Sequence, residues 1–139
     1  MNCAICSAYL ALKHDAKAKG IKMIHCLGCR PRNKNCAWLR KQCPQLSSGE
    51  ISFCYECKTF PCKRLNAIDE RYKTHFRMSM IDNLNFIKKY GMEKFLEEQE
   101  KSWKCKKCGA MICCHNELCF NCDLEKLRNR KQKYRWSED

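Results

Sequence analysis

The side chains with the most evident chemistry in this chain of 139 residues are its fifteen cysteines. Nine lie near the N-terminus, as three C-x-x-C pairs and three single residues: Cys3/Cys6, Cys26/Cys29, Cys54/Cys57, Cys36, Cys43 and Cys62. The two thiolates of a C-x-x-C turn can reach the same metal ion, which is the ligand spacing typical of zinc sites. These cysteines therefore predict two zinc sites of four thiolates each, with one ligand left over.

The spacing leaves open which of these cysteines share an ion. The simplest pairing gives the first two C-x-x-C turns one ion and takes the second site from the remaining five cysteines. His25, beside Cys26, is an alternative ligand, although a single histidine is more often packed or exposed. Cysteines also hold iron–sulfur clusters, so such a cluster is the alternative to zinc in this region.

A second group of cysteines, near the C-terminus, has a more specific spacing. Cys105, Cys108, Cys119 and Cys122 form the pattern C-x2-C-x10-C-x2-C. Two turns at this separation, the first followed by Gly109, predict a zinc ribbon with a hairpin strand over 111–113. Together with the two N-terminal sites, the ribbon raises the expected content to about three zinc ions per chain.

Cys113, Cys114 and His115 lie between the two turns of the predicted ribbon. They are either hairpin residues whose thiols pack as small hydrophobic groups, or further ligands of a shared site. Cys113 is included among the predicted metal ligands.

The composition explains why metal ions would be needed. The chain has few large aliphatic side chains and no valine, so its apolar core must be small. Small cores are usually held together by metals or disulfides. The first residues lack the pattern of a signal peptide, and no run reaches the roughly eighteen apolar residues that span a bilayer. We therefore expect a cytoplasmic protein without a membrane partner, in which reduced thiols bind metal.

The formal charge of +13 either balances buried thiolates or indicates an anionic partner. Each zinc ion with four thiolates carries −2, so three such sites would lower the charge to about +7. Two groups of residues are predicted to contact nucleic acid, because cations attract phosphates and aromatic rings stack on bases. The first is Arg30, Arg32, Lys34, Arg40 and Lys41, and the second is Lys126, Arg128, Arg130, Lys131, Lys133, Tyr134, Arg135 and Trp136. A solvated terminal helix is the alternative for the second group.

Helical signals fill most of the chain between the cysteine groups. We predict helices over 7–19 and 35–43 from their helix-forming residues. Further along, Ser79 is the predicted N-cap of a helix that ends at Gly91, and another helix begins at Met92.

The predicted fold class is a small metal-stabilised α+β protein in three parts. A cysteine-rich metal-binding module occupies 1–62, and a helical connector occupies 63–102. The zinc ribbon and a basic C-terminal helix occupy 103–139.

Three motifs follow one another in the N-terminal module. They are Cys6-Ser-Ala-Tyr-Leu10, Cys26-Leu-Gly-Cys29 and Phe53-Cys-Tyr-Glu-Cys-Lys-Thr-Phe-Pro-Cys-Lys-Arg-Leu65. This order resembles a family of uncharacterised cysteine-rich proteins of archaea and anaerobic bacteria, with the motifs C-P-A-Y, C-x-G-C and C-x-x-C-x-x-[FY]-P-C-x-x-L. Ser7 stands where that family usually has proline. The resemblance covers roughly residues 1–122 and implies metal binding in an intracellular setting, without an established activity.

No pattern in the sequence indicates catalysis. The H-E-x-x-H motif and the Gly-rich phosphate loop are missing, and zinc bound by four thiolates has no open position for water. We therefore expect a structural zinc-binding protein, not an enzyme, which contacts RNA or a ribonucleoprotein through its basic surfaces. The alternatives are an adaptor whose helical middle binds a protein partner, and an iron–sulfur or metal-sensing protein.

Overall fold

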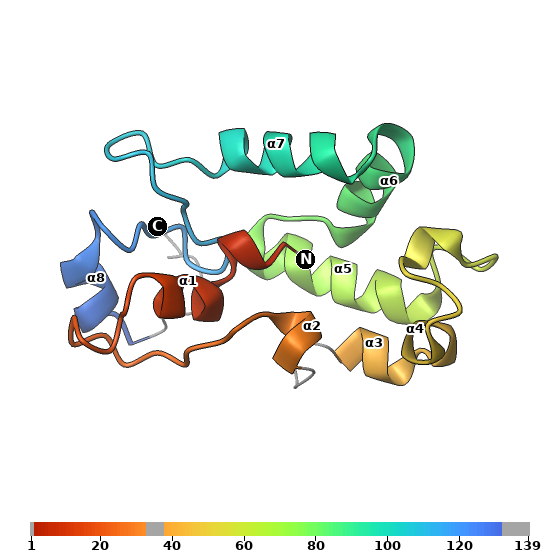
Figure 1. Ribbon diagram of the computed structural model, residues 1–139, viewed down its shortest axis with the longest axis horizontal. Helices are drawn as coiled ribbons and strands as arrows, with labels where there is room; N and C mark the ends of the chain where they lie inside the picture. The colour runs from red at the N-terminus through yellow and green to blue at the C-terminus, as the bar shows by residue number, and fades with distance from the viewer. Residues whose placement is uncertain (1, 33–37, 132–139) are drawn as a thin grey trace. The chain divides into compact units, whose positions relative to one another are not determined.

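The computed structural model describes residues 2–32 and 38–131, and this part of the chain is mostly helical (Figure 1). The helices are η1 (Cys3–Ile5), α1 (Ser7–Lys13), α2 (Cys29–Arg32), α3 (Trp38–Gln42), α4 (Pro44–Ser48), η3 (Cys54–Glu56), α5 (Lys63–Phe76), α6 (Met80–Tyr90), α7 (Met92–Ser102) and α8 (Leu124–Asn129). In the described residues, no helix is both long and apolar enough to cross a membrane.

The described residues form two compact units. The first unit combines residues 2–28 with 98–131, and the second unit contains residues 29–32 and 38–97. Their boundary falls inside α7. These units group the chain differently from the three consecutive segments predicted above, which remain a prediction about its domains.

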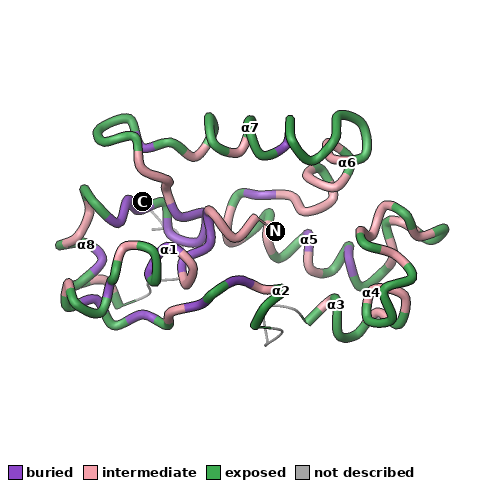
Figure 2. Tube along the Cα trace, in the orientation of Figure 1, coloured by how far each residue is buried: buried purple, intermediate pink, exposed green. Residues whose placement is uncertain are grey.

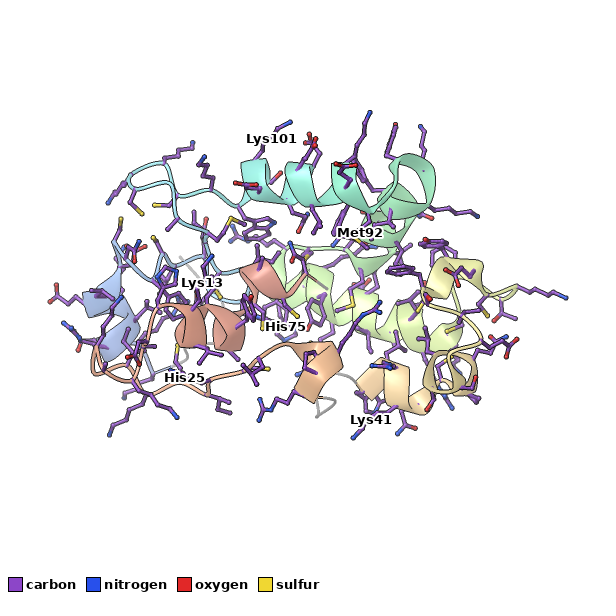
Figure 3. All side chains as sticks on the ribbon, in the orientation of Figure 1. Lys13, His25, Lys41, His75, Met92 and Lys101 are labelled. Atoms are coloured by element: carbon purple, nitrogen blue, oxygen red, sulfur yellow. The ribbon has the colours of Figure 1, made fainter. Side chains whose placement is uncertain are left out.

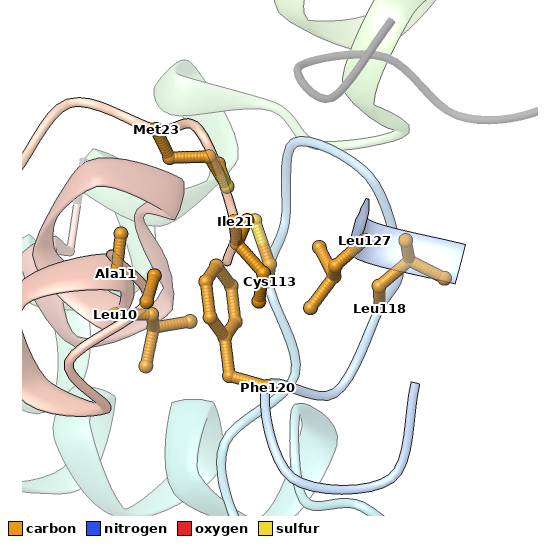
Figure 4. Close-up of a cluster of buried hydrophobic side chains, with 9 residues drawn as sticks. Leu10, Ala11, Ile21, Met23, Cys113, Leu118, Phe120 and Leu127 are labelled. Atoms are coloured by element: carbon orange, nitrogen blue, oxygen red, sulfur yellow. The ribbon is translucent and has the colours of Figure 1, made fainter. Parts of the chain in front are cut away.

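The core of the first unit is built from both ends of the chain (Figure 4). Leu10 and Ala11 of α1 and the following Ile21 pack with Phe120 and Leu127, and each of these side chains is at most 1% exposed. Backbone hydrogen bonds join the same segments, because the Cys114 N–H donates to the Ile5 carbonyl at 2.8 Å. The N-terminal helix is therefore fixed by residues that lie about a hundred positions later in the chain.

The helix predicted over 7–19 ends earlier than expected, at Lys13. Asp15 adopts a left-handed conformation with φ +46°, and two hydrogen bonds close the helix behind it. The Ala16 N–H donates to the Ala11 carbonyl at 2.8 Å, and the Asp15 N–H donates to the Leu12 carbonyl at 3.1 Å. This pattern is a Schellman C-cap, and it turns Ala16 into the core. Burial of Ala16 thus outweighs the helix propensity of the residues that follow.

The predicted α+β class is not confirmed in the described residues. Their β-structure consists of two isolated antiparallel bridges, Lys104 with Met111 and Ile112 with Cys119. The described residues contain no strand of two or more paired residues. A tight turn begins directly after Ile112, since the Glu117 N–H donates to the Cys113 carbonyl at 2.8 Å. No residues remain between the bridge and the turn to extend a ladder.

In the second unit, Asp69 joins α5 to the start of α6. Its Oδ1 accepts hydrogen bonds from the Ser79 hydroxyl at 2.8 Å and from the Ile81 N–H at 2.9 Å. Its Oδ2 lies 2.9 Å from the Lys73 Nζ, and the residue is only 2% exposed. Burial alone would raise the pKa of Asp69, but the hydrogen bonds from Lys73, Ile81 and Ser79 outweigh it and the pKa is lowered.

The predicted caps of α6 are confirmed. The Ser79 hydroxyl accepts from the Asp82 N–H at 3.0 Å, and Gly91 follows the last residue of the helix. α6 has no buried residue, and its tube is drawn in the intermediate and exposed colours (Figure 2). Its Phe86 ring lies 6.2 Å from the ring of Phe95, the buried residue of α7. α7 begins at Met92, as predicted.

We predict that Asp69→Ala destabilises the second unit. The change leaves the Ile81 N–H and the Ser79 hydroxyl without their acceptor, and such losses typically reduce the free energy of unfolding by about 1–3 kcal/mol. Urea unfolding of the full chain would measure the effect, with the exposed neighbour Glu70→Ala as the matched control. Equal stability of the two variants would contradict the role of Asp69.

The same experiment has a pH dependence of known sign. Because the folded-state pKa of Asp69 lies below its unfolded value of about 3.9, its contribution is present above that pH. It is lost as the pH falls through the lower folded value. The stability difference between wild type and Asp69→Ala should therefore shrink below about pH 4 and stay constant above it.

Candidate metal centre

Four cysteines of the first unit form the candidate metal centre. The sulfur atoms of Cys105, Cys108, Cys119 and Cys122 all lie within 4.8 Å of one another. Cys108 Sγ is 3.5 Å from Cys119 Sγ, and Cys105 Sγ is 4.0 Å from Cys122 Sγ. Four sulfurs about 2.3 Å from a shared zinc ion stand roughly 3.8 Å apart, so these spacings fit a tetrahedral site. Among residues 2–32 and 38–131, no other set of three or more Cys, His, Asp or Glu ligand atoms is this close.

The first C-x-x-C turn is shaped by backbone hydrogen bonds around Gly109. The Gly109 N–H donates to the Cys105 carbonyl at 2.8 Å, and the Cys105 N–H donates to the Ala110 carbonyl at 2.7 Å. Gly109 has φ +75°, a conformation that glycine adopts without steric strain. The backbone conformation at position 109 therefore favours the glycine that was predicted to end this turn.

The second C-x-x-C turn is held by Asp123, which precedes α8. The Cys119 N–H donates to the Asp123 carboxylate at 2.9 Å, and the Asp123 N–H donates back to the Cys119 carbonyl at 2.9 Å. This reciprocal pair fixes the turn at the start of the helix. The role of Asp123 was not predicted from the sequence, although an acidic residue directly after the second turn was the available signal.

The four thiols differ in acidity. A hydrogen bond from the Ala110 N–H, with further ones from Cys122 and Cys119, lowers the pKa of Cys108 to about 7. The hydrogen bond with Cys108 is the main cause that raises the pKa of Cys122 to about 12, and burial raises the pKa of Cys119. The first thiolate thus forms at Cys108 and is stabilised by its neighbours' protons. A bound cation would replace those protons, because metal-coordinated thiols are deprotonated.

The residues between the two turns belong to the hydrophobic core. Cys113 is fully buried among apolar side chains, and burial raises its pKa to about 12. His115 Nδ1 accepts a hydrogen bond from the Ser7 N–H at 3.2 Å, and burial lowers the pKa of His115 to about 4. Cys113 is not one of the four clustered cysteines, and a ligand role for Cys113 or His115 remains a prediction.

The predicted N-terminal ligands are distributed over both units. Cys3 begins η1, Cys6 is the N-cap of α1, and Cys29 begins α2 in the second unit. The Cys26 N–H donates to the Ala8 carbonyl at 3.0 Å, and its Sγ accepts from the Gly28 N–H at 3.4 Å. A shared ion for these cysteines remains a prediction, as does the ligand role of His25.

The remaining N-terminal cysteines belong to the second unit. Cys43, Cys54, Cys57 and Cys62 all line one pocket, whereas Cys36 lies outside the described residues. Burial raises the pKa of Cys54, and the charges of Cys43 and Cys62 raise it further. The Thr59 hydroxyl, which lies 3.2 Å from Cys57 Sγ, lowers the pKa of Cys57.

The residues of the first predicted nucleic-acid group that the structure describes are exposed. They are Arg30, Arg32, Arg40 and Lys41, whereas Lys34 lies outside the described residues. Lys41 is labelled at the end of α3 in Figure 3. The guanidinium of Arg30 lies over the ring of Phe53, 5.6 Å from its centroid.

The second predicted group is partly engaged inside the first unit. Arg128 Nε donates to the Lys19 carbonyl at 2.7 Å, and an Arg130 guanidinium nitrogen donates to the Asn116 carbonyl at 3.1 Å. Lys126 and Lys131 are exposed. Lys133, Tyr134, Arg135 and Trp136 lie outside the described residues. The two arginines therefore help to hold α8 in place, a role that the sequence analysis missed.

We predict that Cys108 is alkylated faster than Cys122 in the metal-free, reduced protein. Both thiols are exposed, so their different pKa values decide the rate, since the thiolate is the nucleophile. Iodoacetamide labelling with peptide mass spectrometry would measure the rates. The rate at Cys108 should rise as the pH passes about 7 and then level off, whereas that at Cys122 should keep rising. Equal rates across this range would contradict the order of acidity.

Comparison with known protein families gives a match for the N-terminal part of the chain. Residues 1–67 match the protein family described as "Protein of unknown function (DUF3795)". The match includes all nine N-terminal cysteines but ends within α5, so the resemblance expected to reach residue 122 is shown as far as residue 67. No curated protein and no solved structure matches the chain.

Proposed function

We propose that this chain is a structural zinc-binding protein. The premise is that residues 1–67 belong to an uncharacterised family without a described activity. The observation that carries the proposal is the four-sulfur cluster of Cys105, Cys108, Cys119 and Cys122. Its spacing and its all-thiolate composition suit zinc in a ribbon-type site. An iron ion or an iron–sulfur cluster is the alternative occupant.

The position of the cluster supports a structural role. Cys119 is followed directly by Phe120, a fully buried residue of the first unit's core, and by Asp123 at the start of α8. An ion held by Cys119 would therefore fix the loop that delivers Phe120 to the core. Four thiolates also fill the coordination sphere, so no position is left for a water molecule or a substrate. We accordingly propose that the protein is not an enzyme.

Metal content per chain tests this proposal. We expect the reduced full-length protein to contain zinc, measured by elemental and native mass spectrometry. Cys108→Ser should lose one ion and destabilise the first unit, because the remaining three thiolates bind more weakly. Lys106→Ser is the matched control, since Lys106 is an exposed residue of the same turn.

Two results would overturn the proposal. Unchanged zinc content in Cys108→Ser would show that the cluster is not a zinc site. Iron together with acid-labile sulfide would assign the cysteines to an iron–sulfur protein instead.

We also propose that the basic surfaces contact RNA. What supports this is the exposure of the cationic side chains of Arg32 and Lys41 in the second unit, beside the net charge of the chain. Backbone phosphates attract such side chains. On single strands, each lost phosphate contact reduces the slope of log K against log salt concentration by about 0.7. The proposed partner is RNA or a ribonucleoprotein.

If the basic surface contacts RNA, charge reversal should weaken RNA binding at Arg32 and Lys41 more than at other exposed lysines of the same unit. The double variant Arg32→Glu/Lys41→Glu should bind single-stranded RNA more weakly and with a smaller salt dependence in a gel-shift titration. Lys88→Glu/Lys94→Glu is the control, because both lysines are exposed in the same unit and the change in charge is equal. Equal weakening in both pairs, or no salt-dependent binding by the wild type, would contradict the proposal.

A further inference from the structure

The second unit contains a pocket into which four cysteines from three segments converge. Cys43 is the N-cap of α4, and Cys62 is the N-cap of α5. Cys54 begins the short helix η3, and Cys57 follows its end. All four line the same pocket, which has a volume of about 280 Å³. Residues separated by up to nineteen positions in the sequence thus line one space.

Two contacts hold the three segments at this pocket. The Arg64 guanidinium, two residues after Cys62, donates to the carbonyl of Gln42, the residue before Cys43. Cys57 Sγ donates to the side-chain oxygen of Gln45 at 3.1 Å, and Gln45 lies on α4. In the metal-free protein, where Cys57 is a thiol, these hydrogen bonds support the convergence of the cysteines. A bound ion would replace the Cys57 proton and leave the Arg64 contact in place.

The walls between the thiols are apolar. They are formed mainly by Leu39, Leu46, Ile51, Phe60 and Leu65, and Pro44, Lys63 and Arg64 complete the lining. A pocket that offers sulfur atoms in hydrocarbon walls suits a soft cation, because thiolates select metals such as Zn²⁺ and apolar surroundings limit access of water to the bonds. No carboxylate lines this pocket, so a hard cation that prefers oxygen ligands has little to bind.

We propose that Cys43, Cys54, Cys57 and Cys62 form a second metal site, which takes one thiophilic divalent cation such as Zn²⁺. The inference deepens the proposed metal-binding function but uses none of the ligands of the first site. The Thr59 hydroxyl, 3.2 Å from Cys57 Sγ, is placed to donate to the coordinated thiolate, as outer-shell donors do in metal sites.

The second site differs from the first in how far its ligands are already assembled. No three of its sulfurs lie within 4.8 Å of one another, whereas all four sulfurs of the first site do. A metal ion must therefore draw the second set together, and this rearrangement reduces the affinity. We infer that the second site binds its ion more weakly and releases it first to a chelator.

The test is the number of zinc ions per full-length chain, measured by native mass spectrometry under reducing conditions. Cys54→Ser/Cys62→Ser should hold one ion fewer than the wild type, and Cys108→Ser/Cys122→Ser should lose a different one. The combined four-residue variant should lose both. Lys58→Ser is the control, because Lys58 is an exposed residue next to Cys57. An unchanged count in Cys54→Ser/Cys62→Ser would overturn the second site without affecting the first.

A second measurement needs no variant and so does not depend on the folding of the mutants. The zinc-loaded wild type would be alkylated during stepwise addition of a chelator, and the labelled cysteines mapped by mass spectrometry. Cys57 and Cys62 should be protected at first and become labelled at a lower chelator concentration than Cys108. Labelling of Cys57 at the same rate with and without zinc would overturn the proposal. Labelling of Cys108 before Cys57 would overturn the order of affinities.

Discussion

Burial of Phe120 against the N-terminal segment is the interaction on which the first unit depends. Its side chain is fully buried, packs in one cluster with Leu10 and Ile21, and has the ring of His14 stacked 5.9 Å away. Full burial of such a side chain contributes roughly 1.5–3 kcal/mol, which is a large share of the stability of a small core. Because Phe120 follows Cys119 directly, the core and the four-cysteine cluster depend on the same loop.

Burial and hydrogen bonding change the acidity of individual cysteines in this protein. Cys113 and Cys114 are fully buried, and burial raises the pKa of both. Cys108 and Cys57 are accessible, and hydrogen-bond donors close to their sulfurs lower their pKa. Burial and nearby hydrogen-bond donors therefore shift the pKa values of these thiols in opposite directions.

Some of this arrangement could be predicted from the sequence, because the signals were local. The C-x2-C-x10-C-x2-C spacing identified the four sulfurs that lie within 4.8 Å of one another. Ser79 and Gly91 marked the ends of α6, since capping depends on a few neighbouring residues. The resemblance to an uncharacterised cysteine-rich family was likewise predicted, and residues 1–67 match such a family.

The remaining features depend on contacts that are distant in sequence. α1 stops at Lys13 because Ala16 is buried by the far end of the chain, which no helix propensity can indicate. The grouping of residues 2–28 with 98–131 has the same cause. Asp69 looked like an ordinary charged residue of a helix, and only the fold brings the N-terminus of α6 to its carboxylate.

During synthesis on the ribosome, the two units would become complete at different times. The second unit is continuous in sequence, so all of its residues have been made before Phe120 and Leu127 exist. Domains generally fold as units from the N-terminal side of the nascent chain, and incompletely folded chains expose apolar surface. The apolar side chains of the N-terminal segment therefore stay exposed while the second unit folds, because their packing partners have not yet been translated. These side chains are those of Leu10, Ala11 and Ile21. A chain that stalls within α7 would present these residues to chaperones even though more than half of it had already been translated.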